Sequence, residues 1–168
     1  MNTGAWYVVR SKPRQEGVAL ANLQRQGYQC YLPRLKVLRR IRRRQVVRLE
    51  PMFPQYLFLR PGLETQSIAP VRSTLGVLVL VRFGHEPALL EEEKLDAILA
   101  LESRQNQASM EELSAIVPGS RVMVMEGPLA GMEGLVSAVS AKRVEVLMHL
   151  LGADARVRLA PSSLELAA

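Results

Sequence analysis

The sequence predicts an α+β protein with a larger N-terminal domain and a small C-terminal domain. Strand-like and helix-like segments alternate through the first part of the chain. A polar stretch then interrupts this pattern, and short apolar segments separated by Gly and Pro follow it. We therefore predict a first domain over residues 1–101, a linker over 102–117 and a second domain over 118–168.

The first predicted elements are a strand, a helix and a second strand. The segment Trp6–Arg10 combines aromatic and β-branched residues, which favour a strand. Pro13 suits the first turn of a helix, where its missing N–H is not needed. Gly27 suits the end of that helix, because it readily adopts the left-handed conformation found there. A strand is expected over Tyr28–Pro33.

A strongly basic segment follows this strand. Residues 34–48 hold eight Lys and Arg residues and no acidic residue, and apolar residues flank the Arg-rich middle. This pattern predicts a long hairpin or an extended loop. Cations without acidic neighbours repel one another, and phosphate binding relieves that repulsion while releasing counterions. The segment predicts a nucleic-acid-binding surface, and a solvated hairpin tip without a ligand is the alternative.

The charge of the whole chain supports this prediction. Residues 1–84 carry 15 Lys and Arg against 3 Glu, whereas residues 85–168 carry 7 against 13 Asp and Glu. A basic half of this kind is typical of proteins that bind polyanions, most often nucleic acid.

An aromatic segment follows the basic one. Period-two alternation would place Phe53, Gln55 and Leu57 on one face of a strand and Tyr56 and Phe58 on the other. One face belongs to the core. The other face either packs under a helix or forms an apolar patch for a partner.

The last elements of the first domain are a strand and a helix. Val77–Val81 is almost continuously apolar, which predicts a strand buried on both faces. The acidic run Glu91–Glu93 suits the start of a helix, because acids interact favourably with its positive end. Helical spacing of Leu95, Ile98 and Leu99 gives this helix an apolar stripe. Together these elements predict helices packed against an antiparallel sheet.

The second domain is predicted as a small β-barrel. Its candidate strands are short and are separated by Gly and Pro. They are Arg121–Met125, Gly134–Val139, Val144–Leu150 and Ala155–Leu159.

The sequence offers little for catalysis or metal binding. Cys30 is the only cysteine, which excludes an internal disulfide framework, and it is most simply a small core residue. His85 and His149 each lack a second ligand at metal-binding spacing. We predict that the protein is not an enzyme and has no cofactor and no metal site. No leader and no apolar run of roughly 18 residues is evident, so we expect a soluble, cytoplasmic monomer that does not bind membranes.

Several of these segments resemble the NusG family of transcription elongation factors, and in particular its specialised RfaH-type paralogues. The strand at Trp6 with the Pro13 helix is similar to the start of the NusG N-terminal domain, an α/β sandwich. The run Glu50–Phe58 is similar to the family's Phe-Pro-x-Tyr-hydrophobic-Phe strand. Later signatures are matched by Val71–Val77 and by Val81-Arg82-Phe83-Gly84, and residues 119–134 are similar to the KOW motif.

The resemblance implies a factor that binds the clamp helices of the RNA polymerase large subunit and the non-template DNA strand. Such a factor suppresses pausing and termination of transcription. The implied polymerase-binding residues are Phe53, Tyr56, Phe58, Leu80, Leu95, Ile98 and Leu99. The implied DNA-binding residues are Lys12, Arg14, Gln15, Arg25, Arg39, Arg40, Arg42, Arg43 and Arg44. The chain departs from RfaH-type factors at Ser67–Pro70, where those proteins carry a His followed by threonines for a second clamp contact.

The resemblance also implies a role for the KOW-like domain. It would recruit a small ribosomal subunit protein or the termination factor Rho. RfaH-type factors hide this domain as a helical hairpin against the first domain, and an ion pair between Glu50 and Arg143 would close the two domains. Residues 135–151 contain no Gly or Pro and fit either helical or strand spacing, so a barrel and a helical hairpin are both open. Alternative functions are a housekeeping NusG-like elongation factor and an RNA-binding KOW protein of the ribosome.

Overall fold

The computed structural model describes residues 5–107 and 140–152. Its centre is an antiparallel sheet in which the strands lie in the order β2–β5–β1–β6, and β9 pairs with the start of β1. These strands are β1 (Ala5–Ser11), β2 (Gln29–Tyr31), β5 (Tyr56–Arg60), β6 (Val77–Leu80) and β9 (Leu89–Glu91). The predicted combination of helices with an antiparallel sheet is confirmed for the first domain.

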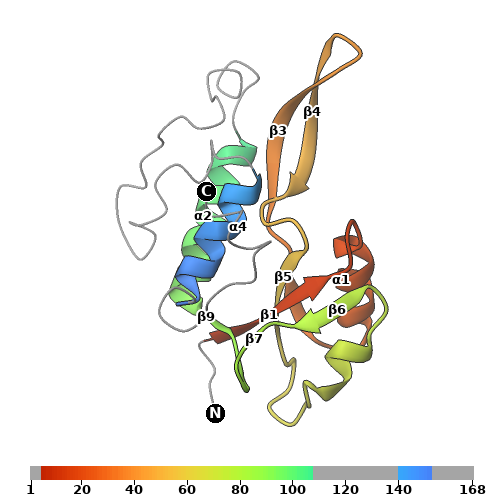
Figure 1. Cartoon of the computed structure of the whole chain (residues 1–168), viewed down its shortest axis with the longest axis vertical. Coiled ribbons are helices and arrows are strands. Elements are labelled where there is room, and N and C mark those ends of the chain that lie inside the picture. The colour runs from red at the N-terminus through yellow and green to blue at the C-terminus, as the bar shows by residue number, and fades with distance from the viewer. Residues whose placement is uncertain (1–4, 108–139, 153–168) are drawn as a thin grey trace.

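Helices cover both faces of this sheet (Figure 1). Alternation along β1 sends Val8 to one face and Val9 to the other, and both side chains are fully buried. The Val9 face packs against α1 (Glu16–Arg25), and the Val8 face packs against α2 (Glu92–Asn106) and α4 (Ser140–Leu150). The first domain therefore has two apolar clusters, one on each side of the sheet.

The connection from the short helix η1 (Ala69–Ser73) to β6 passes close to α1. Gly76 lies in this connection with a φ of +90°, and a Cβ on it would lie 2.7 Å from the backbone nitrogen of Ala19. Only glycine combines this conformation with so close an approach. Gly76 thereby fixes β6 beside α1.

The basic segment forms the predicted hairpin, which projects away from the sheet (Figure 1). Its strands are β3 (Arg34–Ile41) and β4 (Arg44–Pro51), paired from Arg34 opposite Pro51 to Ile41 opposite Arg44. A second, smaller hairpin is formed by β7 (Arg82–Phe83) and β8 (Glu86–Pro87).

Two predictions about buried faces are wrong. In β6, Leu78 and Val79 remain 45% and 44% exposed, because the described part of the chain pairs this strand with β1 alone. Phe53 precedes β5 and lies in one cluster with Tyr56 and Phe58, whereas the alternation predicted it on the other face. Gln55 adopts a left-handed φ of 75°, and the resulting turn breaks the predicted alternation.

The end of α2 also differs from the prediction. The helix continues to Asn106, so residues 102–106 are helical where a linker was predicted. Polar residues near this end form hydrogen bonds with β3, which explains why a polar sequence remains part of the packed domain.

Within the predicted second domain, the predicted strand Val144–Leu150 is wrong, because this segment belongs to α4. Val144, Leu147 and Leu150 recur at helical spacing and are buried against the first domain. The structure thus supports the helical alternative for this segment. The other three predicted strands, the KOW-like motif and residues 108–117 lie outside the described residues. No described helix is both long enough and apolar enough to span a membrane.

Candidate nucleic-acid and partner interfaces

A single apolar cluster joins the first domain to α4. We call it the α2–α4 cluster, and its first-domain members include Phe53, Tyr56, Phe58, Leu95 and Ile98. The members from the C-terminal segment are Val144, Leu147, Met148, Leu150 and Leu151. All are at most 9% exposed in the presence of α4.

The structure brings together all of the predicted polymerase-binding residues except Leu80. Leu99 is partly buried and packs against the α2–α4 cluster. Leu80 lies in the cluster on the opposite face of the sheet, beside Val9 and Leu23. The aromatic residues are buried, so they form no exposed patch while α4 is docked.

Polar contacts at both ends of α4 accompany this packing. Near its start, Arg143 Nε donates a 2.8 Å hydrogen bond to the carbonyl oxygen of Met52. At its end, Lys94 Nζ on α2 donates a 3.0 Å hydrogen bond to the carbonyl oxygen of Leu150. The helix is therefore held to the first domain by directional contacts as well as by apolar burial.

Glu50 and Arg143, the predicted interdomain pair, interact electrostatically. Both carboxylate oxygens of Glu50 accept hydrogen bonds from Arg39, at 2.9 and 2.6 Å. These bonds hold the pKa of Glu50 below its usual value, and the nearby charge of Arg143 lowers it further. Burial lowers the pKa of Arg143, which is only 3% exposed, and the attraction of Glu50 raises it. Glu50 thus faces one cation on the hairpin and another on α4.

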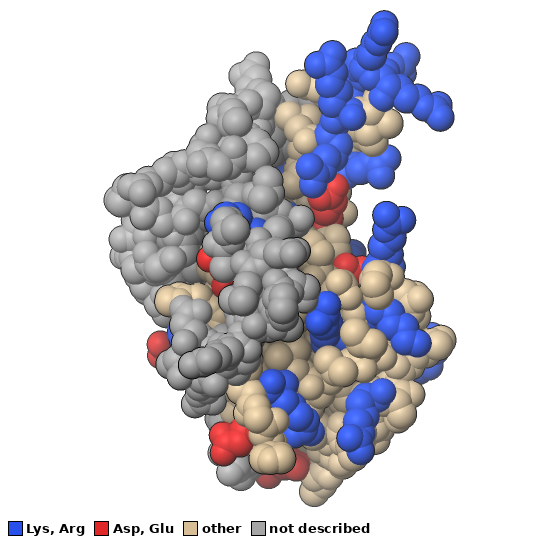
Figure 2. All heavy atoms as spheres, viewed as in Figure 1, with Lys and Arg blue, Asp and Glu red and all other residues tan. Residues whose placement is uncertain are grey.

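The tip of the β3–β4 hairpin concentrates exposed positive charge (Figure 2). Five of the predicted DNA-binding residues lie on this hairpin. One of them, Arg39, is bonded to Glu50, and the side chain of Arg39 is still 48% exposed. The remaining four, Arg40, Arg42, Arg43 and Arg44, are exposed.

The turn at the hairpin tip is strained. Arg42 and Arg43 connect the strands with φ values of 51° and 66°, both in the left-handed region. Two-residue turns of this kind prefer Asn-Gly, because other side chains are unfavourable there by about 1 kcal/mol each. Two arginines at these positions keep charge at the tip at the expense of turn stability. Backbone strain of this sort often marks a functional site.

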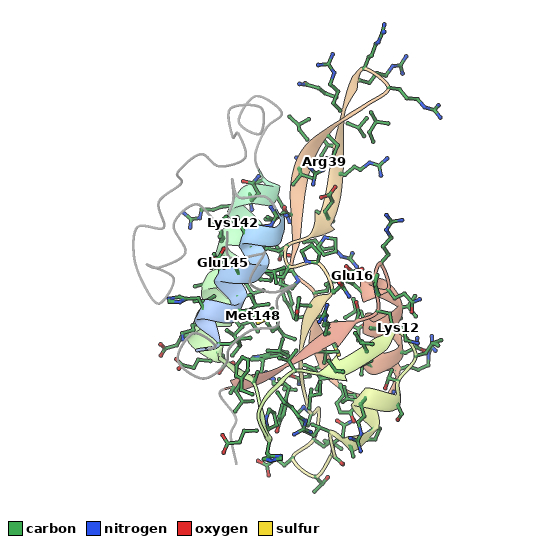
Figure 3. The ribbon with its side chains drawn as sticks, viewed as in Figure 1. Lys12, Glu16, Arg39, Lys142, Glu145 and Met148 are labelled. Atoms are coloured by element: carbon green, nitrogen blue, oxygen red, sulfur yellow. The ribbon has the colours of Figure 1, made fainter. Side chains whose placement is uncertain are left out.

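A second group of predicted DNA-binding residues lies around α1. Lys12 and Arg14 precede the helix and are exposed, Gln15 stands at the N-cap position without a side-chain capping bond, and Arg25 is exposed in the last turn. Arg25 donates a 2.8 Å hydrogen bond to Asn22 Oδ1 on the same helix. Lys12 beside α1 and Arg39 on the hairpin mark the two basic groups (Figure 3). The exposed cations among the predicted DNA-binding residues therefore lie in two separate parts of the fold, around α1 and on the hairpin.

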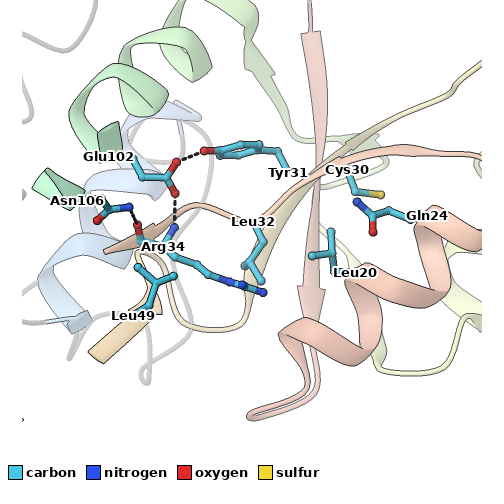
Figure 4. Close-up of a pocket in the computed structure, with 9 residues that line it drawn as sticks. All are labelled: Leu20, Gln24, Cys30, Tyr31, Leu32, Arg34, Leu49, Glu102 and Asn106. Atoms are coloured by element: carbon cyan, nitrogen blue, oxygen red, sulfur yellow. Dashed lines mark hydrogen bonds between the residues drawn. The ribbon is translucent and has the colours of Figure 1, made fainter. Parts of the chain in front are cut away.

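A group of polar residues at the end of α2 was not predicted from the sequence. Glu102, Gln105 and Asn106 form hydrogen bonds with β3. Glu102 and Asn106 border an open pocket of about 320 Å³ between α1, β2 and the base of the hairpin (Figure 4). The lining residues are Leu20, Gln24, Cys30, Tyr31, Leu32, Arg34, Leu49, Glu102 and Asn106. In the sequence, Glu102, Gln105 and Asn106 continue the helical spacing of Leu95 and Ile98. This spacing was the signal that could have predicted their place on the packed face of α2.

The described residues give no sign of redox or metal chemistry. Burial raises the pKa of the Cys30 thiol to about 12, which disfavours the reactive thiolate at neutral pH. Within residues 5–107 and 140–152, no three His, Cys, Asp or Glu residues are grouped in a way that could hold a metal ion.

Comparison with known proteins gives a consistent result. The family model described as transcription termination factor nusG matches residues 4–99. The chain is 28% identical to the transcription termination/antitermination protein NusG of Thermus thermophilus over 173 residues, covering 92% of this chain and 94% of that relative. It is 25% identical to the corresponding protein of Streptomyces virginiae, covering 93% of this chain and 61% of that relative.

Among solved structures, a match described as domain interaction in Thermotoga maritima NusG has a TM-score of 0.40 at 20% identity, covering 76% of this chain and 75% of that one. The family model covers more than half of the sequence and includes β1, α1, the hairpin and the start of α2. The chain therefore belongs to the NusG family of transcription termination and antitermination proteins.

Proposed function

We propose that this protein is an RfaH-type antitermination factor that binds the clamp helices of RNA polymerase and the non-template DNA strand. The observation that carries the proposal is the position of α4. This helix forms from a segment whose spacing also fits a strand, and it packs in one cluster with the residues that the family resemblance assigns to polymerase binding, apart from Leu80. A covered binding surface of this kind is what an autoinhibited, specialised factor requires.

In this proposal the α2–α4 cluster exchanges partners. When α4 leaves, Tyr56, Leu95 and Ile98 become available to the polymerase clamp helices. A protein that bridges the clamp disfavours the opened states that precede pausing and termination, which is a population shift without any covalent step. In this way the first domain would stabilise the closed clamp.

DNA contact is assigned to the two basic groups. The residues around α1 would bind the exposed non-template strand, and the hairpin tip would bind nearby upstream DNA. Contacts with about four phosphates predict a log–log salt slope of roughly −3.6 on duplex DNA or −2.8 on a single strand. The exposure of the tip arginines and the strained turn that presents them support this assignment.

The released C-terminal segment would then recruit a second partner. We propose a small ribosomal subunit protein or Rho, as the family resemblance implies. A housekeeping NusG-like factor is the second candidate, because the similarity to the Thermus thermophilus protein runs along 92% of the chain.

Transcription in vitro separates the two candidates. RNA polymerase is allowed to transcribe a template library with a randomised non-template segment upstream of a pause site and a terminator, with and without the full chain. We expect pausing to fall and read-through to rise on a subset of templates that share a sequence element.

An equal effect on every template would favour the housekeeping factor over the RfaH-type proposal. No effect on any template would contradict both candidates.

A further inference from the structure

The last two turns of α2 bond to the outer edge of β3, the edge that faces away from β4. Lys36 N donates a 2.8 Å hydrogen bond to Asn106 Oδ1, and Asn106 Nδ2 donates a 3.0 Å bond to the carbonyl oxygen of Arg34. One side-chain amide thus satisfies an acceptor and a donor on alternate residues, as a neighbouring strand would.

Two more side chains extend this contact. Arg34 N and the hydroxyl of Tyr31 on β2 both donate hydrogen bonds to the carboxylate of Glu102 (Figure 4). Burial and this bond raise the pKa of Tyr31. Gln105 Nε2 donates a 3.3 Å bond to the carbonyl oxygen of Lys36. We call this set of contacts the α2–β3 junction.

The hairpin needs such support. An isolated two-stranded hairpin is only marginally stable in water, and packing against a helix is one way to hold it. Each strand of eight residues extends about 26 Å at about 3.3 Å per residue. A tilt of about 20° at the base would therefore move the tip by about 9 Å, much further than a hydrogen bond reaches.

The junction lies on the same helix as the apolar face assigned to polymerase. Leu95 and Ile98 point into the α2–α4 cluster, while Glu102 and Asn106 hold β3 one to two turns further along. One rigid helix therefore carries the partner-binding face at one end and the base of the DNA-binding hairpin at the other.

We propose that Glu102, Gln105 and Asn106 are positioning residues that fix the direction of the hairpin relative to α2, so that polymerase and DNA can be bound at once. This inference rests on the proposed function. When one contact is made, the second forms at a high effective concentration, so two weak contacts together give a much higher overall affinity. This gain in affinity is lost when the geometry prevents both contacts from forming together. The junction would supply that geometry.

The test compares a junction variant, Glu102→Ala with Asn106→Ala, with a control, Ser103→Ala with Gln107→Ala. The control residues are exposed and lie beside the junction residues, Ser103 on α2 and Gln107 at its C-cap. Spin labels are placed at Gln45→Cys and Asp96→Cys in a Cys30→Ser background, because Cys30 is the only native cysteine. We expect the distance distribution between the labels to be narrow in the control and at least twice as wide in the junction variant. Equal widths would overturn the proposal.

Binding of the full-length variants is then measured for three probes: a polymerase fragment containing the clamp helices, a short DNA duplex, and a complete elongation complex. We expect the junction variant to bind the two isolated probes within about twofold of the control and the complete complex at least tenfold more weakly. Unchanged affinity for the complete complex, or a parallel loss for all three probes, would contradict a positioning role. If the control itself bound neither isolated probe, the proposed function would be wrong, and the label distances would still decide whether the junction fixes the hairpin.

Discussion

Replacing Arg42 by Asn and Arg43 by Gly should weaken DNA binding while leaving the protein as stable as before or more stable. The two residues occupy left-handed positions for which Asn-Gly is the preferred pair. Relief of this strain should raise the free energy of unfolding by about 1 kcal/mol. Loss of two phosphate contacts should reduce the log–log salt slope by about 1.8 on duplex DNA and the affinity at 0.1 M salt by about 10- to 60-fold.

The measurement is fluorescence anisotropy with a labelled duplex over a range of salt concentrations, together with thermal unfolding. A charge-matched control replaces Arg72 and Arg104 by Gln, since both are exposed and lie outside the hairpin. If the control lost as much affinity and slope as the tip variant, binding would depend on net charge alone, and the hairpin would have no special role.

Replacing Leu147 by Asp should release α4 from the first domain. Leu147 is fully buried in the α2–α4 cluster. The substitution removes an apolar side chain worth about 1.5–3 kcal/mol and would bury an unpaired carboxylate, so undocking is the less costly outcome. A change of about 3 kcal/mol raises the undocked population by about two orders of magnitude.

Trypsin provides a direct readout of this change. Arg143 is 3% exposed while α4 is docked, and cleavage after it requires the helix to leave the first domain. Cleavage after Arg143 is monitored by mass spectrometry. We expect its rate to rise about 100-fold in the Leu147→Asp variant. His149→Asp introduces the same side chain at an exposed position of α4 and should change the rate little. An unchanged rate in the Leu147 variant would show that α4 docking does not depend on the cluster.

Much of the first domain could be predicted because local patterns determine it. Aromatic and β-branched residues predicted β1, and Pro13 with Gly27 bounded the segment that contains α1. The hairpin was predicted because apolar residues flank a charged tip. The Arg-Arg turn inside it was not, because nothing in those residue types favours a left-handed backbone.

The errors arise where tertiary contacts decide the outcome. Val77–Val81 is apolar enough for a central strand, yet the described sheet gives β6 only β1 as a partner, so Leu78 and Val79 stay exposed. Leu80 was assigned to the polymerase-binding set, but the strand pairing directs it to the opposite face of the sheet. The pattern of apolar residues within one strand does not show whether that strand lies at the edge or in the middle of the sheet.

The C-terminal helix shows the same limit in another form. Val144, Leu147 and Leu150 fit a helix, while Val144, Val146 and Met148 fit a strand, and the sequence left both open. The surface that the segment packs against decides between them, because the α2–α4 cluster buries the helical set. The end of α2 was missed for a related reason: Glu102 and Asn106 resemble linker residues until their backbone partners on β3 are known.

The most direct test of the account measures the affinity of the full chain for a polymerase fragment containing the clamp helices, using isothermal titration calorimetry. Wild type, Leu147→Asp, and Leu147→Asp combined with Leu99→Asp are compared. We expect weak binding by wild type, about 100-fold tighter binding by Leu147→Asp, and loss of this gain in the double variant. Equal affinity of wild type and Leu147→Asp, or no binding by either, would contradict the claim that α4 covers the polymerase-binding surface.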